Sequence, residues 1–292
     1  MSATVNTEAA VEQEKNSPFG EVWQRFKKNR IAMASLILLV TLTLLAILAP
    51  LVTSYDPYVG QLPQALKGPS ASHIMGTDEL GRDIYTRIIY GARISLWVGL
   101  LAVAVALAAG TILGSLAAYY GRWADNLIMR FMDIMLAIPS LLLVIAFMMV
   151  LGKGIENAII AIGIVSVPEY VRIVRSSVLA VKENDYVQAA RAIGNRDLAI
   201  IARHILPNIT TPVIVKATLG ISTAILDTAA LGFLGLGVQP PYAEWGTMLG
   251  VGRNCLAPHI VFFPGLAITV TVLAFNLLGD GLRDALDPRL KC

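Results

Sequence analysis

Four long stretches of this 292-residue chain contain no Asp, Glu, Lys or Arg. They are Ile31–Val52, Ile94–Ala118, Ile134–Gly152 and Asn254–Gly279. A helix that crosses the hydrocarbon core of a bilayer needs about 20 mainly apolar residues, so each stretch is long enough to span a membrane. Only 15% of the chain is charged, against about 25% in an average soluble domain. The sequence therefore predicts an all-α integral membrane protein.

Two further apolar stretches are interrupted by charges. Residues 157–179 contain Glu169, Arg172 and Arg175, and residues 209–231 contain Lys216 and Asp227. Counting both as spans gives six crossings. With an internal N-terminus, sixteen Lys and Arg residues then lie inside and six outside. Cytoplasmic loops carry an excess of Lys and Arg, so the charge distribution favours about six spans over four.

These considerations divide the chain into two parts. Residues 1–30 are expected to form a cytoplasmic tail and an amphipathic helix, and residues 31–292 a transmembrane domain with both termini cytoplasmic. The expected spans are about 31–52, 94–118, 131–152, 157–179, 209–231 and 260–279. They leave an external loop at 53–93 and a cytoplasmic loop at 180–207. The expected location is the inner (cytoplasmic) membrane, crossed several times.

The N-terminus does not have the pattern of a secretory signal, because some 30 polar residues precede the first apolar run. Residues 1–17 are expected to be disordered. Phe19–Arg30 is expected to lie on the membrane surface, with Trp23 and Phe26 facing lipid. Alternatively, this segment is only a topology anchor. The net charge of +3 gives no sign of a nucleic acid partner.

The most informative segment is the 180–207 loop. Asp185 is placed to cap a helix, and Gln188 three residues later can reach back to the cap. Gly194 is placed to end that helix. Asn195 could then cap a second short helix through residues 196–205, which Pro207 stops. Helices this short need a surface to pack against, either the chain's own membrane helices or another protein.

The pattern Gln188-Ala189-Ala190, then Gly194 and Ile205-Leu206-Pro207, resembles the Glu-Ala-Ala loop of ATP-binding-cassette (ABC) importer permeases. Gln188 departs from it, since the family has Glu at that position. Further segments resemble the same family: Gly76–Asp83, Gly91–Leu96, Leu231–Pro241, Glu244–Gly246 and Asn276–Pro288. The chain is thus similar, over nearly its whole length, to the C-type permease subunit of dipeptide and oligopeptide importers.

The resemblance implies a type I (MetI-like) importer fold. It also implies partners: a second permease subunit in a heterodimer, two ABC ATPase subunits and an external substrate-binding protein. In the family the loop helix docks on the ATPase. Carried over, the ATPase-coupling positions are Asp185, Gln188, Ala189, Ala190, Arg191 and Gly194.

Nothing in the sequence predicts catalysis by this chain. No Gly-x-x-x-x-Gly-Lys-Ser/Thr phosphate loop occurs, so ATP and magnesium are expected on the partner ATPase subunits and no cofactor on this chain. There is no catalytic triad or metal cluster, and His73 has no evident partner ligands. Cys255 and Cys292 are expected on opposite sides of the membrane, where they could not form a disulfide.

Ionisable residues within spans are the candidates for the substrate pathway. Asp227 is expected near the outer end of the fifth span, where it could attract a peptide amino group or bond to neighbouring polar groups. Asp133 could line the pathway or pair with Arg130, and Lys216 could reach the lipid headgroups. Pro139, Pro168 and Pro212 could kink their helices.

The external loop is expected to contain a helix beginning at Asp78 and capped by Thr77, with Asp83 and Arg87 forming an i,i+4 pair. This segment and the glycine-rich loop 232–246 could dock a binding protein or simply close the structure. Two alternatives to a peptide importer remain at this point. One is the same machine with a nickel chelate or glutathione as cargo, and the other is a self-sufficient secondary transporter or channel.

Overall fold

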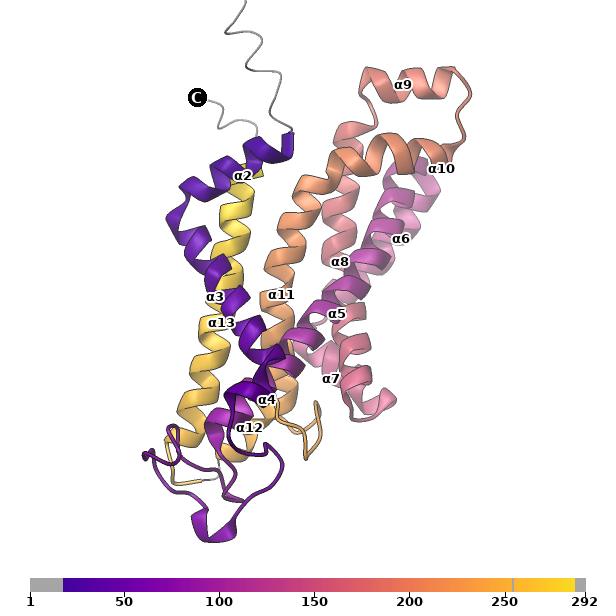
Figure 1. Cartoon of the computed structure of the whole chain (residues 1–292). Helices are drawn as coiled ribbons and strands as arrows, with labels where there is room; N and C mark the ends of the chain where they lie inside the picture. Colours follow the sequence, from indigo (N-terminus) through magenta and orange to yellow (C-terminus); the bar gives the residue numbers. More distant parts are fainter. Residues whose placement is uncertain (1–17, 254, 287–292) are drawn as a thin grey trace, which may run out of the picture.

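Long helices dominate the described part of the chain, residues 18–253 and 255–286, in a computed structural model (Figure 1), and residues 53–83 are mostly loop. The membrane-length and connecting α-helices are α2 (Pro18–Lys28), α3 (Arg30–Ile47), α4 (Ala49–Val52), α5 (Ile84–Tyr120), α6 (Arg122–Leu136), α7 (Ser140–Leu151), α8 (Ile155–Val181), α9 (Asp185–Ala192), α10 (Asp197–Ile200), α11 (Thr210–Phe233), α12 (Trp245–Gly252) and α13 (His259–Leu286). Two short 3₁₀-helices are η2 (Leu62–Gln64) and η4 (Leu206–Ile209), and a short π-helix is η3 (Ile201–Ile205). The described residues contain no β-strand.

Five helical segments are long and apolar enough to cross a membrane, and a sixth span results if α6 and α7 are taken together. The expected span at 131–152 falls on two helices, and the kink expected at Pro139 is a full break. The axes of α6 and α7 differ by 92°, and the break falls at Pro139. Proline has no N–H to donate and its ring clashes with the preceding turn, which explains the break. Pro168 and Pro212, by contrast, lie within continuous helices.

Helix α5 starts ten residues before the expected span. Over its 37 residues it is ~55 Å long, well beyond the ~30 Å hydrocarbon core. The helix begins at Ile84, and its cap is Asp83, whose carboxylate accepts from the Thr86 N–H at 2.8 Å. The expectation of a helix starting at Asp78 under a Thr77 cap was therefore wrong. Thr77 instead donates to the Gln64 carbonyl, within the loop.

The core of the bundle is the close contact between α5 and α8. A Cβ atom added at Gly110 would lie 2.3 Å from the Cβ of Tyr170, so only glycine allows the two backbones to approach this closely. Around this contact lies a cluster of buried apolar side chains that includes Ala106, Val144 and Ile162. α11 packs on both α5 and α13, which places the fifth span at the centre of the bundle.

At one end of the bundle, α2 folds back onto α13 (Figure 1). Phe26 is 3% exposed and packs with Ala32 and Ala285, so the expectation that it faces lipid was wrong. Trp23 remains exposed, stacked on Phe26 and beneath the ammonium group of Lys27. The helix is attached through its apolar face, which packs against Leu278, Leu282 and Ala285 of α13.

Helices α9 and α10 lie at the same end of the bundle as α2, whereas the 53–83 loop and α12 lie at the opposite end (Figure 1).

Candidate functional site

Helix α9 is the exposed part of the 180–207 loop and lies across the end of the bundle (Figure 1). It ends in a Schellman motif. The Gly194 N–H donates to the Arg191 carbonyl at 3.0 Å, and the Asn195 N–H donates to the Ala190 carbonyl at 3.2 Å. Gly194 has φ +80°, the left-handed conformation that this motif requires and that glycine adopts without strain. The sequence-based prediction of the helix end agrees with this geometry.

The start of α9 differs from the prediction. Asn184, not Asp185, occupies the cap position, and no side chain accepts a hydrogen bond there. Gln188 does not complete a capping box, because its Nε2 donates to the Lys182 carbonyl at 3.3 Å. Asp185 is the first helical residue, where its negative charge faces the positive end of the helix dipole.

The predicted second helix is also different in form. It starts at Asp197, with Arg196 rather than Asn195 in the cap position. After one turn it widens into the π-turn η3, tightens into η4, and continues into α11. Pro207 lies within η4 and does not stop the chain from remaining helical. The loop therefore joins α11 without a flexible connection.

The two faces of α9 have different surroundings. Val187 and Ala190 are buried, Ala190 being only 4% exposed, in a cluster with Ile200 and Ile201. Ile193, the residue after the end of the helix, is 79% exposed. The exposed coupling positions are Asp185, Gln188, Ala189, Arg191 and Gly194. Ala190 thus holds the helix in place, while the other five positions are accessible to a partner.

Tyr119, at the end of α5, connects this loop to the bundle. Its hydroxyl donates to Asp197 Oδ1 at 2.8 Å, and the Arg191 guanidinium lies 5.3 Å from its ring centroid. Beside it, Lys182 Nζ donates to the Ala118 carbonyl at 3.0 Å. Tyr119 was not identified from the sequence, because its partners lie more than 60 residues away. It fixes both short helices of the loop to α5.

Helix α8 carries three charged residues that pair with neighbouring helices. Arg172 Nη2 lies 2.6 Å from Asp133 Oδ1, and Arg175 Nη2 lies 2.6 Å from Asp125 Oδ2, both carboxylates being on α6. On the other side, Glu169 pairs with Lys216 of α11. The expected pairing of Asp133 with Arg130 was therefore wrong, and so was the expected reach of Lys216 to the headgroups.

These pairs are unusually accessible for charges within a bundle. The side chains of Arg172, Asp133 and Glu169 are each 50% or more exposed. Charges within spans normally face a bundle interior or water rather than lipid. Asp227 is half-buried on α11, and no hydrogen bond or ion pair joins it to another residue in the described part of the chain. Its electrostatic neighbour is Glu169, a like charge.

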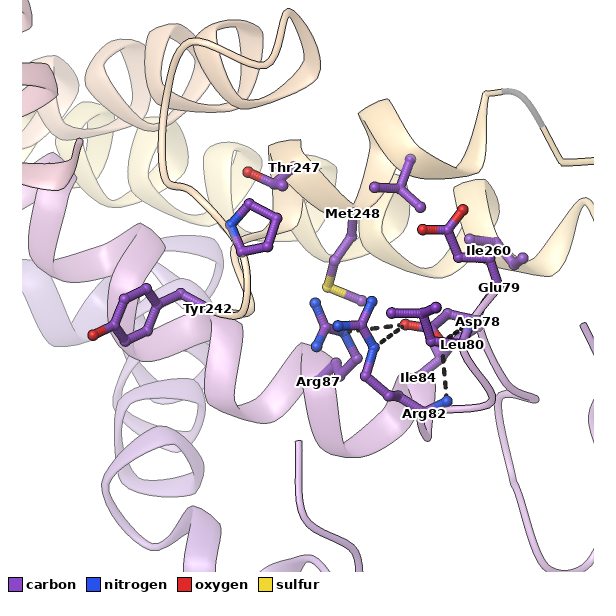
Figure 2. Close-up of a pocket in the computed structure, with 12 residues that line it drawn as sticks. Asp78, Glu79, Leu80, Arg82, Ile84, Arg87, Tyr242, Thr247, Met248 and Ile260 are labelled. Atoms are coloured by element: carbon purple, nitrogen blue, oxygen red, sulfur yellow. Dashed lines mark hydrogen bonds and ion pairs between the residues drawn. The ribbon is translucent and has the colours of Figure 1, made fainter. Parts of the chain in front are cut away.

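At the opposite end of the molecule, the 53–83 loop is held by buried ion pairs. Arg82 Nε lies 2.7 Å from Asp78 Oδ2, and Arg87 Nε lies 3.5 Å from the same oxygen. Figure 2 shows both guanidinium groups reaching toward Asp78 at the edge of a pocket of about 90 Å³. The expected pair of Arg87 with Asp83 is absent, since Asp83 binds His73 Nδ1 at 2.9 Å.

Helix α12 is fixed to α5 by two adjacent side chains. Glu244 is 1% exposed and caps α12 by accepting from the N–H groups of Gly246 and Thr247 at 2.7 and 2.8 Å. Burial raises the pKa of its carboxyl, an effect that these hydrogen bonds oppose. The Trp245 indole donates to the Ile88 carbonyl at 3.0 Å. The glycine-rich loop before α12 thus ends at a firmly held helix.

Within the described residues, no group of three His, Cys, Asp or Glu side chains could hold a metal ion.

Comparison with protein families adds decisive information. Residues 110–291 match the family described as "Binding-protein-dependent transport system inner membrane component". This chain belongs to that family. Residues 17–69 of the permease also match the "N-terminal TM domain of oligopeptide transport permease C". The recognition of a C-type importer permease from sequence motifs is confirmed.

Named relatives cover almost the whole permease. It is 53% identical over 277 residues to the dipeptide transport system permease protein DppC of Alkalihalophilus pseudofirmus, covering 94% of this chain and 91% of that protein. It is 50% identical to the di/tripeptide transport system permease protein DppC of Pseudomonas aeruginosa, with 94% and 93% covered. It is 46% identical to the glutathione transport system permease protein GsiD of Escherichia coli, with 94% and 92% covered.

The fold is also found among solved structures. An inward-facing structure of the MetNI methionine ABC transporter superposes with a TM-score of 0.59 at 17% sequence identity, covering 70% of this permease and 98% of that chain. At this identity the likeness concerns the fold alone. The predicted all-α, MetI-like importer fold is confirmed.

Proposed function

We propose that this permease is the membrane subunit of an ABC importer that moves dipeptides and short oligopeptides across the cytoplasmic membrane. The support is the 53% and 50% identity to permeases named for dipeptide and di/tripeptide transport, each over 94% of the chain. Identity to permeases named for glutathione is lower, at 46%. Glutathione is itself a small peptide, so it is the second candidate, ahead of a nickel chelate.

An uptake assay tests the substrate. Cells that depend on this importer are given a labelled dipeptide, with unlabelled dipeptide, longer peptides, glutathione or a nickel chelate as competitors. We expect unlabelled dipeptide to compete most strongly. Stronger competition by glutathione or by the chelate would assign the importer to that cargo instead.

The energy source in this proposal is ATP hydrolysis on two partner ATPase subunits, with a second permease subunit and an external binding protein completing the assembly. The exposed positions of the 180–207 loop are the proposed contact with one ATPase: Asp185, Gln188, Ala189, Arg191 and Gly194. The support is their accessibility on a helix held firmly from behind by Ala190 and Tyr119. A helix held this way can transmit the movement of a docked protein to the spans.

Replacing Tyr119 with phenylalanine tests this transmission. The aromatic ring and its packing are kept, while the hydrogen bond to Asp197 is lost. Because Asp197 is exposed, we expect a loss of ~1 kcal/mol, about fivefold in an equilibrium constant. Peptides transported per ATP hydrolysed should fall several-fold in the reconstituted importer, and Asp197→Asn should have a smaller effect. An unchanged ratio in Tyr119→Phe would contradict the role of this contact.

Asp227 and Asp133 are proposed to face the substrate pathway, together with the exposed charges of α8. The support for Asp227 is its unpaired, half-buried carboxylate within a span, which could attract a peptide ammonium group. Asp133 is paired with Arg172, so its proposed role is to help keep that face of α8 hydrated.

The proposed docking face for the binding protein consists of the 53–83 loop and the 232–246 loop, which are both held by buried polar contacts.

The two cysteines test the proposed topology, with Cys255 outside and both termini inside. In a Cys292→Ser variant, a membrane-impermeant maleimide should label Cys255 in intact cells. Burial raises the pKa of this thiol, so labelling should be slow at neutral pH and should accelerate as the pH rises and more thiolate forms. In a Cys255→Ser variant, Cys292 should react only after permeabilisation. Labelling of Cys292 in intact cells would reverse the topology.

A further inference from the structure

A cavity of about 740 Å³ lies between five helices, and no part of the proposed transport mechanism uses it. Its walls come from α3, α5, α8, α11 and α13, and nearly all of the lining is apolar. Two of the lining side chains, Trp97 and Leu100, are 58% and 47% exposed, so the cavity opens at the surface of the bundle. This size falls within the ~300–1,000 Å³ of ligand-binding pockets.

The cavity lies in the half of the bundle nearer the 53–83 loop. Ile47, Arg93 and Ile155 line it where α3 ends, where the uncharged part of α5 starts and where α8 begins, all on one side of the bundle. The innermost lining residue on α11 is Ile221, at the middle of that 24-residue helix. From Arg93 to Leu100 the cavity follows α5 for ~10 Å, which lies within the ~15 Å thickness of the hydrocarbon part of one leaflet.

A positive charge stands at the mouth of this cavity. Arg93 Nη2 donates to the Ile47 carbonyl at 2.7 Å, and Nε donates to the Ala46 carbonyl. Its guanidinium also lies 5.2 Å from the Tyr90 ring centroid. These partners are all neutral, and no carboxylate in residues 18–253 or 255–286 forms an ion pair with Arg93. The guanidinium therefore caps the carbonyl end of α3 and has no acidic side chain as a partner within these residues.

We propose that the cavity binds one acyl chain of a phospholipid, and that Arg93 binds the phosphate of that lipid. The apolar walls, the opening at the surface of the bundle and a cation without an acidic partner at the mouth all match a phospholipid. A helix of a partner subunit is the alternative occupant, and cysteine cross-linking distinguishes it from a lipid.

The test uses the full-length permease in the complex with which it purifies. The probe is phosphatidylglycerol with a diazirine at the end of one acyl chain, added at about one lipid per permease and activated by light. We expect labelling near Ile221 and Phe275, the deep end of the cavity. Diacylglycerol with the same chains lacks the phosphate and should label at least fivefold less. Equal labelling by the two lipids would overturn the role given to Arg93.

A filled cavity provides the matched comparison. Leu100→Trp places a large ring in the cavity, whereas Leu273→Trp makes the same change at an exposed leucine of α13 that does not line it. Labelling should fall at least fivefold in Leu100→Trp and stay unchanged in Leu273→Trp. Unchanged labelling in Leu100→Trp would contradict the proposal. So would a cysteine cross-link between Leu100→Cys and a second permease subunit, which would show that protein fills the space.

Discussion

Replacing Ala190 with aspartate is expected to abolish transport while the permease still inserts into the membrane. Ala190 is 4% exposed and packs with Val187 and Ile200. A carboxylate there would be buried without a partner, at a cost of about 3–5 kcal/mol. That is enough to detach α9 from the bundle, because the helix has only eight residues and cannot persist alone. The ATPase contact would be lost with it.

Two control variants make this result specific. Ala190→Ser adds a small polar group, and Ala192→Asp adds the same charge at an exposed position of the same helix. Both should retain most of the uptake of labelled dipeptide. Surface labelling of Cys255 should show equal insertion for all three variants. Normal uptake by Ala190→Asp would show that α9 need not be attached for transport to occur.

Replacing Gly194 with tryptophan should have an effect of similar size by a different route. A Cβ at Gly194 would meet no atom within 4 Å, and the residue is exposed, so a side chain can leave the backbone here toward solvent. The positive φ of +80° adds a strain of about 1–2 kcal/mol. The larger effect is external, since the ring would project from the surface where an ATPase is proposed to dock. We expect uptake to fall to background and the ATPase to be lost on purification.

Gly194→Asn separates the two causes. Asparagine tolerates the left-handed conformation, so the Schellman motif should survive. We expect uptake close to that of the unchanged permease. If Gly194→Trp still carries the ATPase and transports normally, the tip of the 180–207 loop does not lie in the interface.

Sequence reasoning worked best where the signal was local. The lengths of the apolar runs predicted the spans, and Gly194 marked the end of α9 because a left-handed residue is needed there. Recognition of the family also came from contiguous motifs. Kinks were predicted equally for Pro139 and Pro168, yet only Pro139 breaks its helix, because proline within a helix is compatible with either outcome.

Pairings between distant residues could not be predicted from spacing alone. Asp133 has Arg130 three residues away, yet it pairs with Arg172 of another helix. An i,i+3 ion pair on an exposed helix face adds little to the free energy of folding. The packing of the helices therefore decides which oppositely charged side chain lies nearest. Tyr119 illustrates the same limit, because nothing near it in the sequence indicates a contact with Asp197.

The length of α5 has a mechanical consequence. One end is fixed by the Asp83 cap within the 53–83 loop, and the other by Tyr119 beneath the two short helices. A stiff lever of ~55 Å converts a tilt of ~10° into a displacement of ~10 Å at its far tip. A small rotation imposed on α5 at the 180–207 loop would therefore move its other end, at the 53–83 loop, by a large distance, without side-chain rearrangements in between.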